Sequence, residues 1–201
     1  MKRTLSTVAA ACLAVGMGTA AAAPVLWSSG SGGNDHWYDY VFSEGGVAWE
    51  VARANSLAST HLGLQGYLAT VTSDNENLFL DQFVAPGGFR GGWLGGSDAA
   101  IEGEWRWADG PEAGILFWLG GSSGSTTTYA AWGGGWPNTA DYLEYRNPSW
   151  ASVGSEATLR SYYYVEYSAA STPPGTVPLP GTLSLVGLAL LGLPLARRKG
   201  G

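Results

Sequence analysis

Cysteine is nearly absent from this chain of 201 residues, which has one, at position 12. A disulfide within the chain is therefore excluded, and packing alone must hold the fold together. Histidine is also scarce, and two histidines are too few for a metal site built on several imidazoles. Charged residues make up 13% of the sequence and aromatic residues 12%. A composition so rich in core-forming side chains predicts a folded domain and excludes a disordered chain.

Basic residues are rare in the central part of the chain. All 16 acidic residues lie between Asp35 and Glu166, where five basic residues accompany them, so this part has a net charge of −11. The other five basic residues lie close to the two ends. A surface this acidic repels phosphate groups and anionic lipid headgroups. We therefore expect no binding to nucleic acid and no polybasic docking to membranes.

The N-terminal segment, residues 1–23, has the pattern of a secretory signal peptide. Two basic residues precede a short apolar run, and small residues lead to the expected cleavage site near Ala22 or Ala23. A membrane span is the alternative, although the apolar run is short for one. Cys12 would leave with the peptide, so the exported protein would contain no thiol.

The C-terminal segment combines a proline motif, a short apolar run and a basic tail. Residues 168–176 form an expected Pro/Ser-rich linker, and Val-Pro-Leu-Pro-Gly at 177–181 opens a largely apolar run at 182–196. Residues 177–201 resemble the PEP-CTERM sorting signal of Gram-negative bacteria, except that Leu179 replaces the glutamate of that motif. The resemblance implies transient anchoring in the inner membrane by a short transmembrane helix, cleavage by an exosortase, and a secreted or cell-surface location in the biofilm matrix. A permanent anchor is the alternative.

Residues 24–167 remain as the working domain, and two patterns in them predict helices. Apolar residues between Val47 and Leu62 recur at three- and four-residue spacings and predict an amphipathic helix. Ser73 and Glu76 have the spacing of a capping box, in which each side chain binds the other's backbone N–H, and predict a helix over 74–83. The residues expected to face the core are Val47, Val51, Ala54, Leu57, Ala58 and Leu62 in the first helix, and Leu78, Phe79 and Phe83 in the second.

Short β-prone segments surround these helices and predict an α+β domain. A stretch rich in glycine, serine and threonine at 110–138 shows no periodicity, and a loop of this length is usually functional. The strands are expected at 36–42, 67–72, 92–95, 104–108, 142–146 and 162–167.

Eight segments of this domain follow one another in the order seen in C-type lectin-like domains. The resemblance implies that fold: two helices packed on short antiparallel sheets, with a long ligand loop. Tyr142 and Val165 stand near positions that hold disulfide cysteines in animal members, so this version is disulfide-free. The segments lie at 49–53, 66–71, 73–76 with Phe79, 93–96, 102–110, 129–132, 137–138 and 164–167.

Tryptophans divide into two groups by their surroundings. Trp118 and Trp136 lie in the glycine-rich stretch and are candidate ligand contacts, together with Asn138. The others in the motifs are expected first in the core, because each removes up to about 200 Å² from water, and only second as sugar platforms. These core tryptophans are Trp93, Trp105, Trp107 and Trp132.

The resemblance also implies calcium chemistry, which requires about six to eight oxygen ligands. The family's sugar site takes a Glu or Gln and an Asn around a proline, a Glu before the next strand, and an Asn-Asp pair after a tryptophan. Here Trp136-Pro137-Asn138 keeps only the asparagine, and Ala140 and Ala151-Ser152 replace the remaining ligands. Conventional calcium-dependent sugar binding is therefore not expected.

A second, structural calcium position is better preserved. Asp98, Glu102 and Asp141 match the family's carboxylate ligands, whereas Thr139 stands where another acid would be. Three converging carboxylates are costly unless a cation neutralises them. The alternative is that they are solvated, or paired with Arg106 or Arg146.

Signals for catalysis are thin. A G-x-S-x-G pattern at 120–124 lies in the glycine-rich stretch, where no strand-to-helix turn is expected. We therefore expect a binding protein and not an enzyme. Its ligand would be a polysaccharide or other glycan held by Trp136, Trp118 and Asn138, and the alternative is a non-lectin adhesion or matrix protein that binds a surface protein through the same loop.

Overall fold

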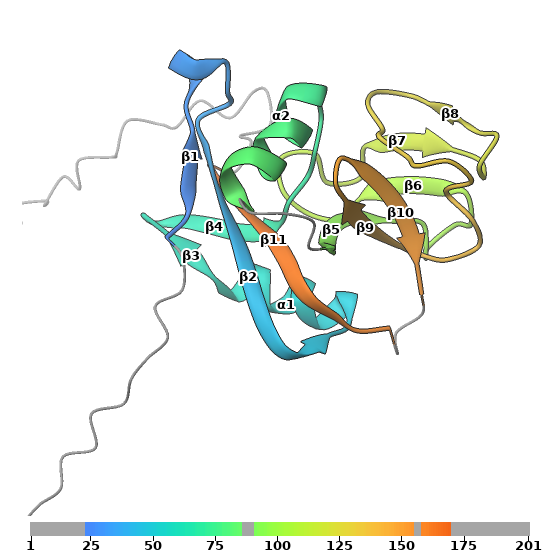
Figure 1. Ribbon diagram of the computed structural model, residues 1–201, viewed down its shortest axis with the longest axis horizontal. Helices are drawn as coiled ribbons and strands as arrows, with labels where there is room; N and C mark the ends of the chain where they lie inside the picture. Colours follow the sequence, from blue (N-terminus) through green and yellow to red (C-terminus); the bar gives the residue numbers. More distant parts are fainter. Residues whose placement is uncertain (1–22, 86–90, 155–157, 170–201) are drawn as a thin grey trace, which may run out of the picture. The chain divides into compact units, whose positions relative to one another are not determined.

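The computed structural model describes residues 23–85, 91–154 and 158–169. Almost all of the predicted signal peptide and linker, and the whole sorting segment, lie outside these ranges. Among the described residues, no helix is both long and apolar enough to cross a membrane. The elements, drawn in Figure 1, are β1 (Val25–Trp27), η1 (Ser29–Ser31), β2 (His36–Val47), α1 (Trp49–Ala58), β3 (Thr60–His61), β4 (Leu64–Leu68), α2 (Asp74–Phe79), η2 (Leu80–Val84), β5 (Gly92–Ser97), β6 (Glu104–Trp107), β7 (Leu116–Leu119), β8 (Ser125–Thr126), β9 (Tyr142–Arg146), β10 (Ser149–Val153) and β11 (Arg160–Ser168).

Strands β2 and β11 run side by side (Figure 1), so a strand from the start of the domain's sequence pairs with the strand that ends it. They pair antiparallel, with Tyr164 opposite Tyr40. Strand β11 also pairs antiparallel with β4, and parallel with β5 where Tyr163 lies opposite Trp93. The described strands form one sheet in the order β1-β2-β11-β5-β6-β7-β8, with β3 on β4, β9 on β5 and β10 on β9. The predicted α+β arrangement of two helices and short strands is confirmed.

Helix α1 turns a different face to the core from the one that the sequence predicts. It buries Trp49, Ala52 and Ser56, which share one side because they are spaced by three and four residues. Trp49 sets this orientation: its indole N–H donates to the Leu94 carbonyl at 2.7 Å, and its ring stacks on Tyr142. The predicted face was therefore wrong, and its exposed members are Val51, Ala54, Leu57, Ala58 and Leu62.

Helix α2 begins at the predicted cap, but half of the predicted capping box is absent. Ser73 Oγ accepts the Glu76 backbone N–H at 3.2 Å. The Glu76 carboxylate does not return to Ser73 and instead accepts the backbone N–H of Thr72 at 2.7 Å and its hydroxyl at 2.9 Å. Glu76 is drawn away because its other oxygen belongs to a buried network with Tyr38.

The C-terminal end of the same helical segment widens into the π-helix η2. Phe79 is buried as predicted, whereas Leu78 and Phe83 are exposed. A π turn contains more residues than an α turn, so Leu80 and Val84 take the buried positions that an α-helix would have given to Phe83. The expected core role of Leu78 and Phe83 was therefore wrong.

The glycine-rich stretch at 110–138 contains structure that its lack of periodicity concealed. Strand β7 pairs with β6, placing Trp118 opposite Trp105, and β8 pairs with β7. Phe117 points inward and is fully buried. Strands of two and four residues are too short to show an alternation in the sequence. The G-x-S-x-G pattern lies at the turn between β7 and β8.

Aromatic packing supplies the core of this disulfide-free domain. Trp93, Trp105 and Trp107 are buried as predicted, and Trp132 is partly buried against the cluster that contains Trp105 and Trp107. Trp107 stacks on Phe117 with ring centres 4.3 Å apart. The two positions near family cysteines, Tyr142 and Val165, are buried in one cluster with Trp49 and Trp93.

Candidate functional site

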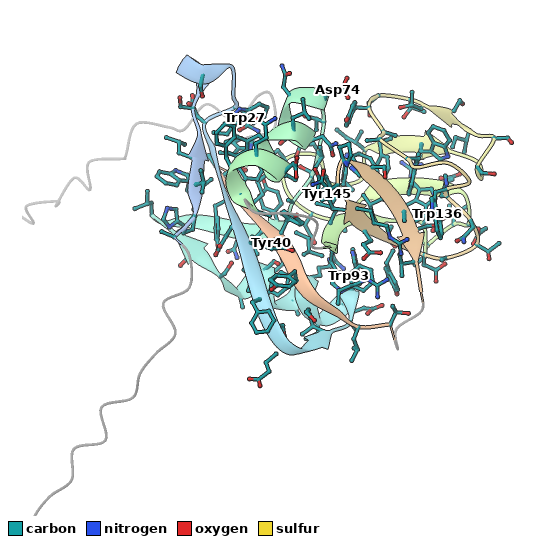
Figure 2. The ribbon with its side chains drawn as sticks, viewed as in Figure 1. Trp27, Tyr40, Asp74, Trp93, Trp136 and Tyr145 are labelled. Carbon is teal, nitrogen blue, oxygen red and sulfur yellow. The ribbon has the colours of Figure 1, made fainter. Side chains whose placement is uncertain are left out.

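Trp136 lies beside the β9–β10 hairpin, in the stretch between β8 and β9 (Figure 2). Its side chain is partly exposed, and the Arg146 guanidinium of β9 lies over the indole ring, 5.5 Å from its centre. The Trp136 backbone N–H donates to the Gly133 carbonyl at 3.2 Å. A cation therefore covers one part of the ring, and the backbone turn holds its position.

Asn138 is exposed, yet its side-chain oxygen is already occupied. Asn138 Oδ1 accepts the Ser152 hydroxyl at 2.8 Å and the Ala140 backbone N–H at 3.0 Å. The Ser152 hydroxyl also accepts the Asn138 backbone N–H at 2.8 Å. The Asn138 Nδ2 amide donates no hydrogen bond to another residue that the structure describes. The loop is thus closed by a side-chain contact at the position where the family places an aspartate.

Trp118 lies within the aromatic core region. Its indole N–H donates to the Gly120 carbonyl at 2.9 Å, and its ring meets Trp132 edge-on, with centres 6.3 Å apart. The side chain is partly buried against the cluster that contains Phe117. Trp118 therefore offers a ligand part of a ring face but not its N–H donor.

The three predicted calcium ligands surround the turn between β5 and β6. Asp98 is 1% exposed, and its Oδ2 accepts the Gly103 backbone N–H at 2.9 Å. Its Oδ1 is buried without a partner among the described residues. Burial, and then the charges of Glu102 and Asp141, raise the pKa of Asp98 to about 6. Glu102 is exposed and Asp141 is partly buried.

The alternative role of these acids, pairing with nearby arginines, is not found among the described residues. Arg106 binds Glu104 at 2.8 Å, and Arg146 binds Glu144 at 2.9 Å. The ranges that the structure describes also contain no group of three or more His, Cys, Asp or Glu side chains placed to hold a metal ion. The donor that fits a cation is the orphaned Asp98 oxygen, and further ligands would have to be water or backbone oxygens.

A pocket of about 540 Å³ beside Trp136 escaped the sequence analysis. A buried carboxylate, Glu144, lies between two guanidinium groups: Arg146 Nε donates to it at 2.9 Å and Arg160 Nε at 2.6 Å. Glu144 and Arg146 are two residues apart on one strand, and this spacing could have indicated that they share a face of the sheet. Nothing local in the sequence places Arg160 with them. The lining residues are Gly91, Glu144, Arg146, Leu159, Arg160, Ser161 and Tyr162.

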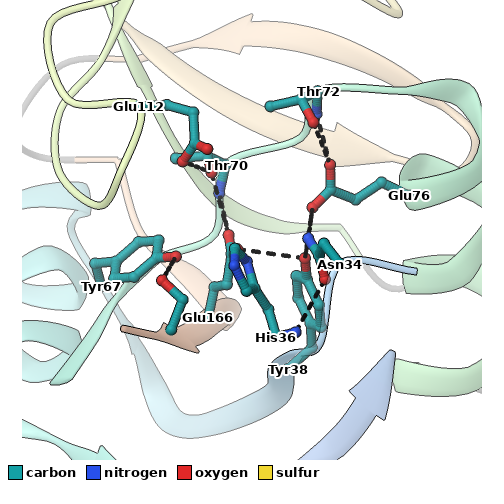
Figure 3. Close-up of polar contacts among 10 residues, drawn as sticks. Asn34, His36, Tyr38, Tyr67, Thr70, Thr72, Glu76, Glu112 and Glu166 are labelled. Atoms are coloured by element: carbon teal, nitrogen blue, oxygen red, sulfur yellow. Dashed lines mark hydrogen bonds and ion pairs between the residues drawn. The ribbon is translucent and has the colours of Figure 1, made fainter. Parts of the chain in front are cut away.

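A buried polar network, also missed, ties β2 and β11 to the start of α2 (Figure 3). Glu166 Oε1 contacts His36 Nδ1 at 2.5 Å, and Glu166 Oε2 accepts the Thr70 backbone N–H at 3.0 Å. The Tyr38 hydroxyl donates to Glu76 at 2.5 Å and contacts Glu166 at 3.3 Å.

Two members of this network have raised pKa values. Burial, and then the charge of Glu166, raise the pKa of Glu76 to about 7. Burial lowers the pKa of His36, but the hydrogen bond and charge of Glu166 outweigh it, so the net shift is upward. Folding therefore favours the protonated form of both groups, which links the stability of the domain to pH.

Comparisons with known proteins bear on the identity of this domain. No family model matches the chain. The chain is 38% identical over 156 residues to halomucin of Haloquadratum walsbyi, covering 71% of the chain and 2% of that protein. It is 30% identical over 135 residues to CD209 antigen-like protein C of Mus musculus, covering 66% of the chain and 65% of that protein. The chain thus spans less than two thirds of either relative.

Comparison with solved structures bears on the fold of the domain. The EPNH mutant of CEL-I, a C-type lectin from Cucumaria echinata, superposes with a TM-score of 0.50 at 22% identity, covering 67% of this chain and 91% of that one. Human lithostathine superposes with a TM-score of 0.50 at 18% identity, covering 68% of this chain and 94% of that one. The described part of the chain therefore has the C-type lectin-like fold.

Proposed function

We propose that this domain binds carbohydrate on the surface around Trp136 and Asn138, without a calcium ion bridging the protein and the sugar. The observation that carries the proposal is the engagement of Asn138 Oδ1 by Ser152 and Ala140. Similarity to ladderlectin of Oncorhynchus mykiss, 41% identical over 75 residues that cover 36% of this chain and 40% of that protein, supports the choice of ligand class.

Calcium chelation at this position would need oxygen ligands that these residues do not supply. The surviving asparagine oxygen accepts two hydrogen bonds, and a cation could take it only by displacing the Ser152 hydroxyl. The Trp136 side chain contributes no oxygen. An indole face and an amide N–H₂ group instead suit stacking on a sugar ring and donation to a sugar hydroxyl.

A glycan array probed with the purified domain, in calcium and in excess chelator, tests this proposal. Binding that persists in chelator and is weakened by Trp136→Ala and by Asn138→Ala is expected. Phe83→Ala is the control, because it removes an exposed aromatic side chain from η2. Binding abolished by chelator would contradict the calcium-independent mode.

The array also separates the second candidate function, a non-lectin adhesion role. Its distinguishing result is no glycan bound at any calcium concentration, together with retention on native matrix that is lost after the matrix is treated with protease. If the domain binds carbohydrate, glycosidase treatment of the matrix should remove the retention instead. A role in binding without catalysis is part of both proposals.

We further propose a structural cation at Asp98, with Glu102 and Asp141 lowering the electrostatic potential around it. The unpartnered Asp98 oxygen and its raised pKa support this position. Export as a signal-peptide-bearing, exosortase-processed protein of the cell surface or matrix also stays a proposal, supported by the residue patterns at 1–23 and 177–201.

A further inference from the structure

We propose that the pocket between Arg146 and Arg160 binds the acidic group of an anionic polysaccharide, either a uronate carboxylate or a sulfate ester. The inference rests on the proposed function and deepens it, because it names the class of sugar. It assigns the ligand's charge to a part of the surface that the C-type calcium site does not use.

The pocket carries more positive than negative charge. Glu144 is buried and is shared by both guanidinium groups. Arg160 places Nε at 2.6 Å and Nη2 at 3.1 Å from the carboxylate, and gives Nη1 to the Leu159 carbonyl at 2.9 Å. Among the lining residues that the structure describes, one carboxylate against two guanidinium groups leaves a net charge of +1, in a central part of the chain that is otherwise strongly acidic.

Arg146 keeps donors for a ligand. Its side chain is 38% exposed, and its Nε–H binds Glu144. Its two terminal amino groups have no hydrogen-bond partner among the described residues. A planar guanidinium with its outer edge free matches the two oxygens of a carboxylate or sulfate.

Both guanidinium groups are fixed before any ligand arrives. Arg146 lies over Trp136, and the Arg160 guanidinium carbon lies 5.3 Å from the centre of the Trp93 ring. Their shared contact with Glu144 restricts them further. Such preorganisation reduces the entropy lost when a ligand binds.

Aromatic rings beside the pocket favour a sugar over a simple anion. Tyr162 lines the pocket and stacks on Tyr40, with ring centres 4.5 Å apart and planes 6° from parallel. Phe42 is 61% exposed, and its ring centre lies 5.2 Å from that of Tyr162. Flat apolar faces next to a cationic edge suit a pyranose ring that carries an acidic substituent.

The same arginine joins this pocket to the surface of the proposed function. Arg146 lines the pocket and also lies over Trp136, so the two binding surfaces adjoin. A chain of acidic sugars could therefore contact Trp136 through one ring and Arg146 through the charge of the next. Nucleic acid is disfavoured, because an excess of one positive charge does not offset repulsion by the acidic remainder.

Binding assays with matched polysaccharides test the inference on the intact domain. The probes are polygalacturonate, its methyl ester, dextran sulfate, dextran and polyglutamate. We expect at least one acidic polysaccharide to bind about tenfold more tightly than its neutral counterpart, as one charged hydrogen-bonded contact predicts. Preference for polygalacturonate or for dextran sulfate identifies the acidic group as carboxylate or sulfate.

Arginine variants assign that preference to the pocket. Arg146→Gln should reduce binding of the acidic polysaccharide about tenfold more than it reduces binding of the neutral one, which can change only through the contact of Arg146 with Trp136. Arg146→Lys should lie between, because it keeps the charge and loses the planar fork. Arg106→Gln is the matched control: this arginine is 42% exposed and also pairs with a glutamate, but it lies on β6 outside the pocket. Melting temperatures check that each variant is folded.

The outcomes separate this inference from the proposed function. Equal binding of acidic and neutral polysaccharides would overturn the inference and leave carbohydrate binding intact. An acidic preference that survives Arg146→Gln would overturn the assignment to this pocket. Binding of polyglutamate as tight as that of the polysaccharides would overturn the sugar specificity, and no binding of any polysaccharide would overturn both proposals.

Discussion

The guanidinium of Arg146 lies over the indole ring of Trp136, 5.5 Å from its centre. Arg146 is itself held by the buried Glu144 at 2.9 Å. A tryptophan in a glycine-rich stretch is thereby linked to a strand of the sheet through an arginine and a carboxylate. Trp136 is fixed on the surface of the domain and does not belong to its buried clusters.

Trp136→Ala should separate a ligand contact from a core residue. Losing the cation–π contact should reduce the free energy of unfolding by about 0.5–1 kcal/mol, whereas losing an aromatic anchor should weaken ligand binding by about 1–3 kcal/mol. Thermal unfolding and binding isotherms of the same variant measure both. A large loss of stability would remove Trp136 from the proposed site.

Trp107→Ala supplies the opposite pattern. Trp107 is buried and stacks on Phe117, so its truncation leaves a cavity that the core cannot fill. We expect a loss of about 3–5 kcal/mol in the free energy of unfolding, measured by denaturant titration. A cost below about 1 kcal/mol would mean that this aromatic stack does not hold the disulfide-free core together.

Stability should fall as pH rises from the acidic to the weakly alkaline range. Folding raises the pKa of Glu76 from 4.5 to about 7. Its contribution to the free energy of unfolding is therefore fully present below pH 4.5 and is lost as the pH rises through about 7. His36, whose pKa is raised from 6.5, acts in the same direction at higher pH. Denaturant unfolding at a series of pH values measures the slope. Glu76→Gln should flatten it, while Glu44→Gln on the exposed surface should not, and a stability that rises over this range would contradict the assignment.

Asp98→Asn should have opposite effects with and without calcium. The pKa of Asp98 is raised from 3.8 to about 6, so ionised Asp98 costs stability at neutral pH, and its neutral replacement should be at least as stable in chelator. Calcium at a hundredfold excess over its Kd should stabilise the wild type by about 2.7 kcal/mol and leave the variant unchanged. Melting temperatures in chelator and in millimolar calcium test this. Absence of a calcium-dependent rise in the wild type would remove the cation from the proposal.

The two ends of the chain should be missing from the released protein. Signal peptidase would remove residues up to about Ala23, and exosortase processing would remove the apolar run at 182–196. Intact mass spectrometry of the protein in the medium and on the cell surface measures both cuts. A released form that retains the apolar run would contradict sorting and leave the permanent anchor as the better account.

Local features of the sequence predicted much of the fold. The order of the motifs gave the C-type lectin-like arrangement, and β9 has its predicted bounds at Tyr142–Arg146. Ser73 caps α2 as its spacing indicated. The core positions of Trp93 and Trp105 could be anticipated, because a large aromatic side chain has few favourable places outside a core.

By itself, then, the sequence determined the absence of disulfides, the acidic net charge and most of the aromatic core, since each follows from composition or from residues close together in the chain. It determined the fold class through the order of its elements and the resemblance of eight segments to a known family. Only the tertiary structure decided which face α1 buries, that Ser152 occupies the oxygen of Asn138, and that Arg160 joins Arg146 on Glu144. These contacts join residues from separate strands and loops. The pairing of β11 and β9 with β5 brings Arg160 to Glu144, and the pairing of β10 with β9 holds Ser152 on the strand beside them. Periodicity reports only what neighbours along the chain share, so no local pattern could place one buried carboxylate between two arginines.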